Sequence, residues 1–258
     1  NHGGSCRVVP PDENFLPNME ALRTAINAKT KGVLINSPNN PSGVVYGAET
    51  LSKICEIIKD KEEEFGTEIY LISDEPYRKI IFDDLKYSYI FGYHPRTIVA
   101  TSHSKDLALP GERIGYLAVH PSYPSAEELM DAMILCNRVL GFVNAPAIMQ
   151  HAVKALQNIT IDIGEYQIKR DFLYNNLKEI GYQVVLPHGA FYMFPKSPIN
   201  DELQFIDMLQ NEGVLVVPGR GFGMAGYFRI SYCVEQNTLE GAIKGFKIVA
   251  ERLGLKSS

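Results

Sequence analysis

The sequence of 258 residues has no tryptophan and only four cysteines, none of them in a C-x-x-C pair. We therefore expect neither a zinc site nor a disulfide framework, and we interpret the cysteines as buried, reduced thiols of a cytoplasmic protein. No apolar run approaches the roughly 18 residues of a membrane span, so no membrane partner is expected. Basic residues are not in excess: 25 Lys and Arg stand against 30 Asp and Glu, for a net charge of −5. This balance gives no sign of a nucleic-acid surface.

The remaining composition is that of an ordinary folded chain, with 45% hydrophobic and 21% charged residues. The length allows one large domain or two modest ones. The histidines show no metal-ligand spacing, so we predict no metal site. The chain opens on Asn1-His2-Gly3-Gly4 rather than on Met, which we interpret as a start inside a longer protein.

Strand and helix signals alternate in the first half of the chain. Short apolar runs predict strands over residues 32–36, 69–73, 97–101 and 114–119. Between the first two, Leu51, Ile54, Cys55 and Ile58 follow the i, i+3, i+4, i+7 spacing of an amphipathic helix. Alternation of this kind favours a largely parallel sheet of the α/β class.

In the second half of the chain, longer helical patterns are combined with short strand signals. We expect helices near residues 125–140, 161–180, 201–210 and 235–253, with Gly181 as the C-cap of the long second one. Short strands are expected at 183–185, 190–194, 214–217 and 227–232. The sequence thus predicts two domains, 1–160 and 161–258, with the long helix beginning a small C-terminal α+β domain.

Polar clusters follow three of the predicted strands. They are Asn39-Asn40-Pro41, Asp74-Glu75-Pro76-Tyr77 and Ser102-His103-Ser104-Lys105. Ligands of open α/β sheets bind outside the carboxyl ends of the strands. One Asp or Lys in such a place is usually a helix cap or a solvated charge, but three clusters together favour a binding site.

These side chains suit one cofactor. A lysine at this edge can form a Schiff base with a carbonyl. Pyridoxal phosphate needs such a lysine and an acidic or basic partner at its pyridine nitrogen, which Asp74 could provide. Ser102 and Arg113, at −3 and +8 from Lys105, could hold the phosphate.

The same segments resemble a known family in order and spacing. The segments Asn39-Asn40-Pro41-Ser42-Gly43, Ser73-Asp74-Glu75-Pro76-Tyr77 and Ser102-His103-Ser104-Lys105, with Gly111-Glu112-Arg113-Ile114-Gly115-Tyr116 and Arg229, are similar to those of class I/II aminotransferases. These are fold-type-I pyridoxal-phosphate enzymes of the aspartate aminotransferase kind, and the resemblance spans essentially the whole chain. It implies an α/β fold: a three-layer large domain with a mostly parallel sheet, here incomplete, plus a small C-terminal α+β domain.

The resemblance assigns cofactor roles position by position. Lys105 would form the internal aldimine and move the proton between Cα and C4′ of the cofactor. Asp74 would pair with the pyridine nitrogen, and Tyr77 and Asn40 would hydrogen-bond the phenolic oxygen. The phosphate ligands it implies are Ser102 and Arg113.

For the substrate, the resemblance implies that Arg229 grips the α-carboxylate with its bidentate fork, next to Asn40. The implied reaction moves an amino group from an L-amino acid to a 2-oxo acid by a ping-pong mechanism, in a cytoplasmic homodimer. The family's Gly-rich phosphate loop and ring-stacking aromatic residue are not found before Asn39. We therefore expect an aminotransferase that lacks its N-terminal part.

Several alternatives stay open. The same residues serve carbon–sulfur lyases of this fold, and some transcription regulators carry a non-catalytic aminotransferase-like effector domain. Arg138 lies near where aspartate-specific relatives place a second carboxylate-binding arginine. Gly221–Gly226 fits the dinucleotide pattern G-x-G-x-x-G, but a strand rather than a helix is predicted after it, so we expect it to shape the turn before Arg229. We interpret His103 as structural or as part of a pocket wall.

Overall fold

The computed structural model describes residues 3–256, which form two compact units. The first unit holds residues 1–37, 46–79 and 86–161, and the second holds 38–45, 80–85 and 162–258. The second unit therefore includes two short segments from the middle of the first. The division into domains 1–160 and 161–258 remains a prediction.

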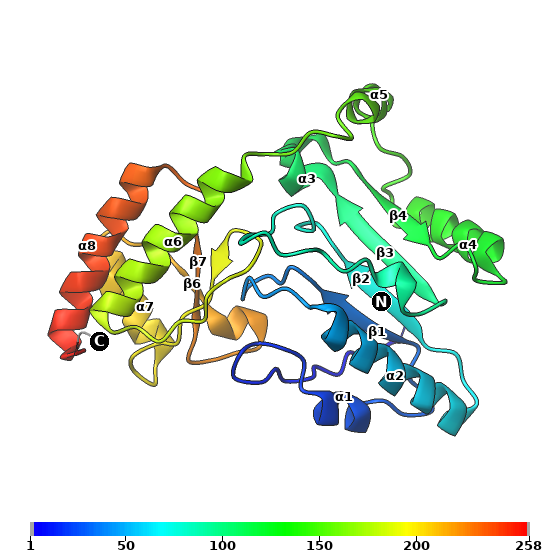
Figure 1. Ribbon diagram of the computed structural model, residues 1–258, viewed down its shortest axis with the longest axis horizontal. Helices are drawn as coiled ribbons and strands as arrows, with labels where there is room; N and C mark the ends of the chain where they lie inside the picture. Colours follow the sequence, from blue (N-terminus) through cyan, green and yellow to red (C-terminus); the bar gives the residue numbers. More distant parts are fainter. Residues whose placement is uncertain (1–2, 257–258) are drawn as a thin grey trace. The chain divides into compact units, whose positions relative to one another are not determined.

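A four-stranded sheet organises the first unit, in the order β1-β2-β3-β4 (Figure 1). The strands are β1 (Gly32–Asn36), β2 (Tyr70–Asp74), β3 (Thr97–Ser102) and β4 (Gly115–Val119). The first three are parallel, and β4 runs antiparallel to β3. The prediction of a mostly parallel α/β sheet is confirmed. The parallel strands deliver their carboxyl ends to one edge, where Asn36 and Asp74 stand in register.

Helices of the first unit are α1 (Met19–Ala25), α2 (Ala48–Phe65), the single turn α3 (His103–Asp106), α4 (Ala126–Val139) and α5 (Ala147–Ala155). The predicted apolar face of α2 is confirmed, because Leu51, Ile54, Cys55 and Ile58 are all buried. The apolar residues of α4 are less buried than those of α2. Leu129 and Met133 are half-buried, whereas Cys136 and Leu140 are exposed. The sequence analysis missed α1, although its cap was legible, since the Asn18 side chain accepts from the Ala21 amide at 2.9 Å.

In the second unit, α6 (Ile163–Ile180) and α8 (Gln236–Leu253) run side by side (Figure 1). The same unit also contains α7 (Glu202–Asn211) and an antiparallel sheet in the order β5-β7-β6. Its strands are β5 (Tyr192–Met193), β6 (Val217–Pro218) and β7 (Phe228–Ser231). Gly181 ends α6 in the left-handed conformation, with φ of 106°, as predicted.

The predicted strand over 183–185 is wrong. The Lys196 amide donates to the Gln183 carbonyl at 2.9 Å, but no ladder continues from this bond within residues 3–256. None of the helices in that part of the chain is long and apolar enough to cross a membrane.

Candidate functional site

The edge formed by the carboxyl ends of β1, β2 and β3 carries the first group of candidate residues. Asp74 is the last residue of β2, and Ser102 is the last residue of the neighbouring β3. Asn36, at the end of β1, donates from Nδ2 to Oδ2 of Asp74 at 3.1 Å and to its carbonyl at 3.0 Å. The sequence analysis did not single out Asn36, although its position as a polar end to an apolar strand was visible.

Asp74 is a half-buried carboxylate that accepts a hydrogen bond from the neutral amide of Asn36. Burial raises its pKa, and no basic side chain among residues 3–256 forms an ion pair with it. A carboxylate in this state gains most from a cationic hydrogen-bond donor, because the donor offsets the lost hydration. A protonated pyridine nitrogen is such a donor, so the site fits this part of pyridoxal phosphate.

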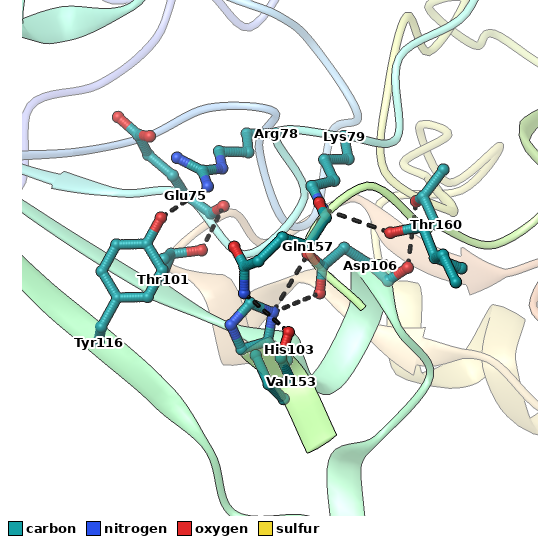
Figure 2. A network of polar contacts seen from close by, with 11 residues as sticks. Glu75, Arg78, Lys79, Thr101, His103, Asp106, Tyr116, Val153, Gln157 and Thr160 are labelled. Carbon is teal, nitrogen blue, oxygen red and sulfur yellow. Dashed lines mark hydrogen bonds and ion pairs between the residues drawn. The ribbon is translucent and has the colours of Figure 1, made fainter. Parts of the chain in front are cut away.

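The segment after β2 is fastened to the sheet from several sides. Glu75 is 2% exposed, accepts from the Ser73 hydroxyl at 2.8 Å and has its pKa raised by burial. The Glu75 carbonyl accepts from Thr101 Oγ1 at 3.0 Å, and Arg78 donates to the Tyr116 hydroxyl at 2.6 Å (Figure 2). Tyr77 lies within this segment and is 4% exposed. The turn that carries Tyr77 is therefore held firmly.

Lys105 lies in α3, directly after β3, and His103 and Asp106 of the same helical turn belong to a polar network (Figure 2). His103 is buried, and its Nδ1 lies 3.3 Å from each carboxylate oxygen of Asp106. Lys79 Nζ lies 3.3 Å from Asp106 Oδ2. The interpretation of His103 as structural fits this arrangement. The part played by Lys79 and Asp106 was missed, because 27 residues separate them in the sequence.

The same network forms hydrogen bonds with residues 157–160, the segment just before α6. Lys79 Nζ also donates to the carbonyls of Gln157 and Ile159, at 3.3 and 3.4 Å. Thr160 Oγ1 donates to the Asp106 carbonyl at 3.1 Å. The one-turn helix around Lys105 is thus fixed at Asp106 through both its side chain and its backbone.

Of the two predicted phosphate ligands, Ser102 is the last residue of β3 and Arg113 lies just before β4. Ser102 precedes α3 but does not cap it with its side chain. Arg113 is exposed in the left-handed region, with φ of 50°, and donates to the Pro110 carbonyl at 2.6 Å. Gly115 pairs with Ser102 across the ladder, where a Cβ would lie 2.3 Å from the Thr101 carbonyl oxygen. Only glycine allows the two strands to approach this closely next to Ser102.

The second unit brings Asn40 and Arg229 together, although 189 residues separate them. Arg229 lies on β7 and donates from Nη1 to Asn40 Oδ1 at 2.9 Å. Its guanidinium carbon is 4.5 Å from the Tyr192 ring centroid and 4.8 Å from that of Phe222. Its Nε is buried and has no hydrogen-bond partner within residues 3–256. A buried donor without a partner is costly, so this group fits an anionic ligand such as a carboxylate.

The remaining predictions have mixed outcomes. The segment after Gly226 is the strand β7, as expected, so the dinucleotide helix is not formed there. Arg138 lies in the last turn of α4 and is exposed, and its role stays a prediction. All four cysteines are free, but only Cys55 is buried, so the expected burial of the other three is wrong. No group of three or more His, Cys, Asp or Glu side chains in residues 3–256 is arranged to hold a metal ion.

Known proteins are similar to this chain in sequence and in fold. A family model described as aminotransferase class I and II matches residues 1–246. A probable aspartate aminotransferase from Methanocaldococcus jannaschii is 34% identical, over 96% of this chain and 66% of that protein. An aspartate/prephenate aminotransferase from Thermus thermophilus is 31% identical, over 94% of this chain and 62% of that protein.

Two solved structures are similar as well. An aminotransferase from Eubacterium rectale gives a TM-score of 0.92 at 42% identity, over 95% of this chain and 62% of that one. An aspartate aminotransferase from Thermotoga maritima gives 0.82 at 30% identity, over 96% and 64%. The fold is that of the aspartate aminotransferases. The chain belongs to the class I and II aminotransferases, which are pyridoxal-phosphate-dependent enzymes. It spans somewhat less than two thirds of the length of these relatives.

Proposed function

We propose that this protein transfers an amino group from an L-amino acid to a 2-oxo acid with pyridoxal phosphate as its cofactor. The observation that carries the proposal is the placement of Asp74 and Lys105 by two neighbouring parallel strands at one sheet edge. Membership of the aminotransferase family supports it. When bound, pyridoxal phosphate supplies the carbonyl that receives the amino group and a ring that withdraws electrons from the substrate Cα.

In this proposal each side chain has a defined task. The Lys105 amine holds the cofactor and moves the proton at the substrate Cα. Asp74 holds a proton on the pyridine nitrogen, and Tyr77 and Asn40 donate to the phenolic oxygen. Ser102 and Arg113 bind the phosphate. Arg229, oriented by Asn40 Oδ1, binds the α-carboxylate.

The proposal extends to the setting of the enzyme. We propose a homodimer, which the apolar side chains exposed on α4 support. A cytoplasmic location is proposed from the cysteine content and the family resemblance, and the domain division at residues 160/161 from the pattern of predicted strands and helices. We propose no preference among amino-acid side chains.

Replacing the Schiff-base lysine tests the proposed function. We expect Lys105→Ala to lose both the visible absorption band of bound pyridoxal phosphate and all measurable amino transfer. The exposed Lys59→Ala on α2 is the matched control and should keep both. Normal turnover by Lys105→Ala would refute the assignment.

Product analysis separates the proposed reaction from the related lyase chemistry. An aminotransferase should release 2-oxo acid only in proportion to the added acceptor, with parallel lines in double-reciprocal plots. Release of pyruvate and ammonia without an acceptor would instead establish a lyase. A stable cofactor band with neither reaction would point to a binding domain.

A further inference from the structure

The guanidinium of Arg229 contacts two aromatic rings. The Tyr192 centroid lies 4.5 Å from its central carbon and the Phe222 centroid 4.8 Å. Cation–π contacts at these distances favour a charged group lying against the ring. Because Nη1 is engaged by Asn40, the Nε side of the guanidinium is the part left to bind a ligand.

Phe222 lies in the loop that carries the G-x-G-x-x-G pattern. Backbone hydrogen bonds and glycines fix the conformation of this loop. The Gly219 amide donates to the Tyr227 carbonyl at 2.7 Å, and the Met224 amide donates to the Gly219 carbonyl at 3.0 Å. A Cβ on Gly219 would lie 2.3 Å from the Met224 carbonyl oxygen, so this approach requires glycine. Gly223, with φ of 77°, then turns the chain directly after Phe222.

An ion pair holds the same loop from outside. Arg220 Nε donates to Glu202 Oε1 at 2.7 Å, and Glu202 is 1% exposed. The Gly226 amide also bonds the Glu202 carboxylate, and with Arg220 it lowers the pKa of Glu202 to about 2. Glu202 therefore contacts both ends of the loop that presents Phe222.

We propose that Phe222 is a positioning residue for the substrate carboxylate, and that the Glu202–Arg220 pair sets its place against Arg229. This inference rests on the proposed function, in which Arg229 binds the carboxylate. Contacts with the two rings and the hydrogen bond to Asn40 limit the rotation of the guanidinium, so the fork is already oriented before the ligand arrives. Pre-orientation lowers the entropy lost on binding and acts on substrate affinity more than on the later proton transfer.

Two substitutions of Phe222 in the cofactor-loaded enzyme test the first half of the proposal. Phe222→Leu keeps an apolar side chain but removes the ring face, and we expect KM for the amino acid to rise about 5- to 30-fold. We expect kcat to stay within about twofold, as for loss of binding shared by ground and transition states. Phe222→Tyr retains the ring and should restore the parental KM. The visible cofactor band should be unchanged in both variants.

The proposed role of the Glu202–Arg220 pair is tested at Arg220, its exposed member. The Arg220 side chain is 50% exposed, so Arg220→Met should fold, and we expect a smaller rise in KM of about 3- to 10-fold. Arg252→Met is the matched control, because Arg252 pairs with Glu212 at 2.6 Å on the same unit with 53% exposure. If Arg220 acts through Phe222, Arg220→Met should add nothing in the Phe222→Leu background.

The outcomes separate this inference from the proposed function. An unchanged KM in Phe222→Leu, together with a raised KM in Arg229→Lys, overturns the inference and leaves the carboxylate site standing. An unchanged KM in Arg229→Lys removes the carboxylate site itself. Independent, multiplying effects of Arg220→Met and Phe222→Leu would show that the ion pair does not act through the ring.

Discussion

Asp74 combines a cost to the fold with the role that we propose for it in the reaction. Its carboxylate is half-buried at the end of β2, with the amide of Asn36 as a neutral partner. The charged form is therefore less stable in the folded chain than in the unfolded chain, which is why its pKa is raised. Pyridoxal phosphate would reverse this balance by presenting a protonated nitrogen.

Asp74→Asn should separate these two roles. In the cofactor-loaded enzyme, we expect the variant to keep its absorption band but to transfer amino groups at least about 100-fold more slowly, because a preorganised charge is lost. Asp131→Asn, on the exposed face of α4, is the control and should leave the rate unchanged. A rate for Asp74→Asn close to that of the parent would disprove the role at the pyridine nitrogen.

The same substitution should raise the stability of the cofactor-free protein. A raised pKa means that the carboxylate destabilises the fold above that pKa, and that this penalty fades as the pH falls through it. At pH 7 the melting temperature of Asp74→Asn should exceed that of the parent by about 2 °C. The gain should disappear in acid, where Asp74 is protonated. A lower melting temperature at pH 7 would contradict this account.

Sequence reasoning located residues better than it located contacts. Asp74 and Lys105 could be placed at one sheet edge, because parallel strands deliver their ends together. The approach of Phe222 to Arg229 could not be foreseen, since it depends on how eight loop residues turn back on themselves. Lys79 and Asp106 were missed for a similar reason: each alone resembles a solvated charge.

At the scale of elements, α6 shows how a helix can bury a charge within its apolar stripe. Tyr166, Leu173, Leu177 and Ile180 follow helical spacing on one face, and the last three are buried. Arg170 lies on the same stripe and is 1% exposed. It donates to the two carboxylate oxygens of Asp83 at 2.8 and 2.7 Å and to the Pro187 carbonyl at 2.8 Å.

This bidentate pair fastens the segment 80–85 to α6, and its loss should be costly. Arg170→Met removes three hydrogen bonds and the contact of the guanidinium with the Phe82 ring, whose centroid lies 5.0 Å away. We expect a loss of about 3 kcal/mol, measured as a lower denaturation midpoint. Asp83→Asn should cost less, because Asp83 is partly exposed and water can replace it. Equal losses would show that the charge matters more than the burial of Arg170.

Strands of the second unit were harder to predict than its helices. The run 190–194 contains only the two residues of β5, and the run 214–217 overlaps β6 (Val217–Pro218) at Val217 alone. The run 190–194 is buried throughout, and a buried irregular segment has the same composition as a buried strand. In the run 214–217 only Val214 is buried, so its apolar composition does not indicate a core strand. Helices α7 and α8 differ from their predicted bounds by a residue or less at each end, because their 3.6-residue period is independent of such neighbours.

At the scale of the whole chain, the surface of α4 and the loop after it is unusually apolar. Large hydrophobic side chains there are 49% to 73% exposed: Met130, Ile134, Leu135, Val139, Leu140, Phe142 and Val143. A continuous apolar surface of this kind drives association. We expect this chain to self-associate at micromolar concentrations.

Two charges on α4 should weaken that association. Leu135→Glu combined with Val139→Lys places an i, i+4 ion pair on positions that are 62% and 72% exposed. Sedimentation velocity should show a shift toward the monomer, with the melting temperature within about 2 °C of the parent. Leu215→Glu, an 81% exposed position in the second unit, is the control and should leave the association unchanged. Unaltered sedimentation of the double variant would place the association elsewhere.

The interleaved order of the two units affects how the protein is made. Segments 38–45 and 80–85 leave the ribosome early, yet their unit is completed by residues 162–258. At ordinary elongation rates the delay is on the order of ten seconds. During that interval Phe82, which is fully buried in the finished protein, has no unit to enter. Nascent chains halted between residues 85 and 161 should therefore be good chaperone substrates, and those extended through α8 should not.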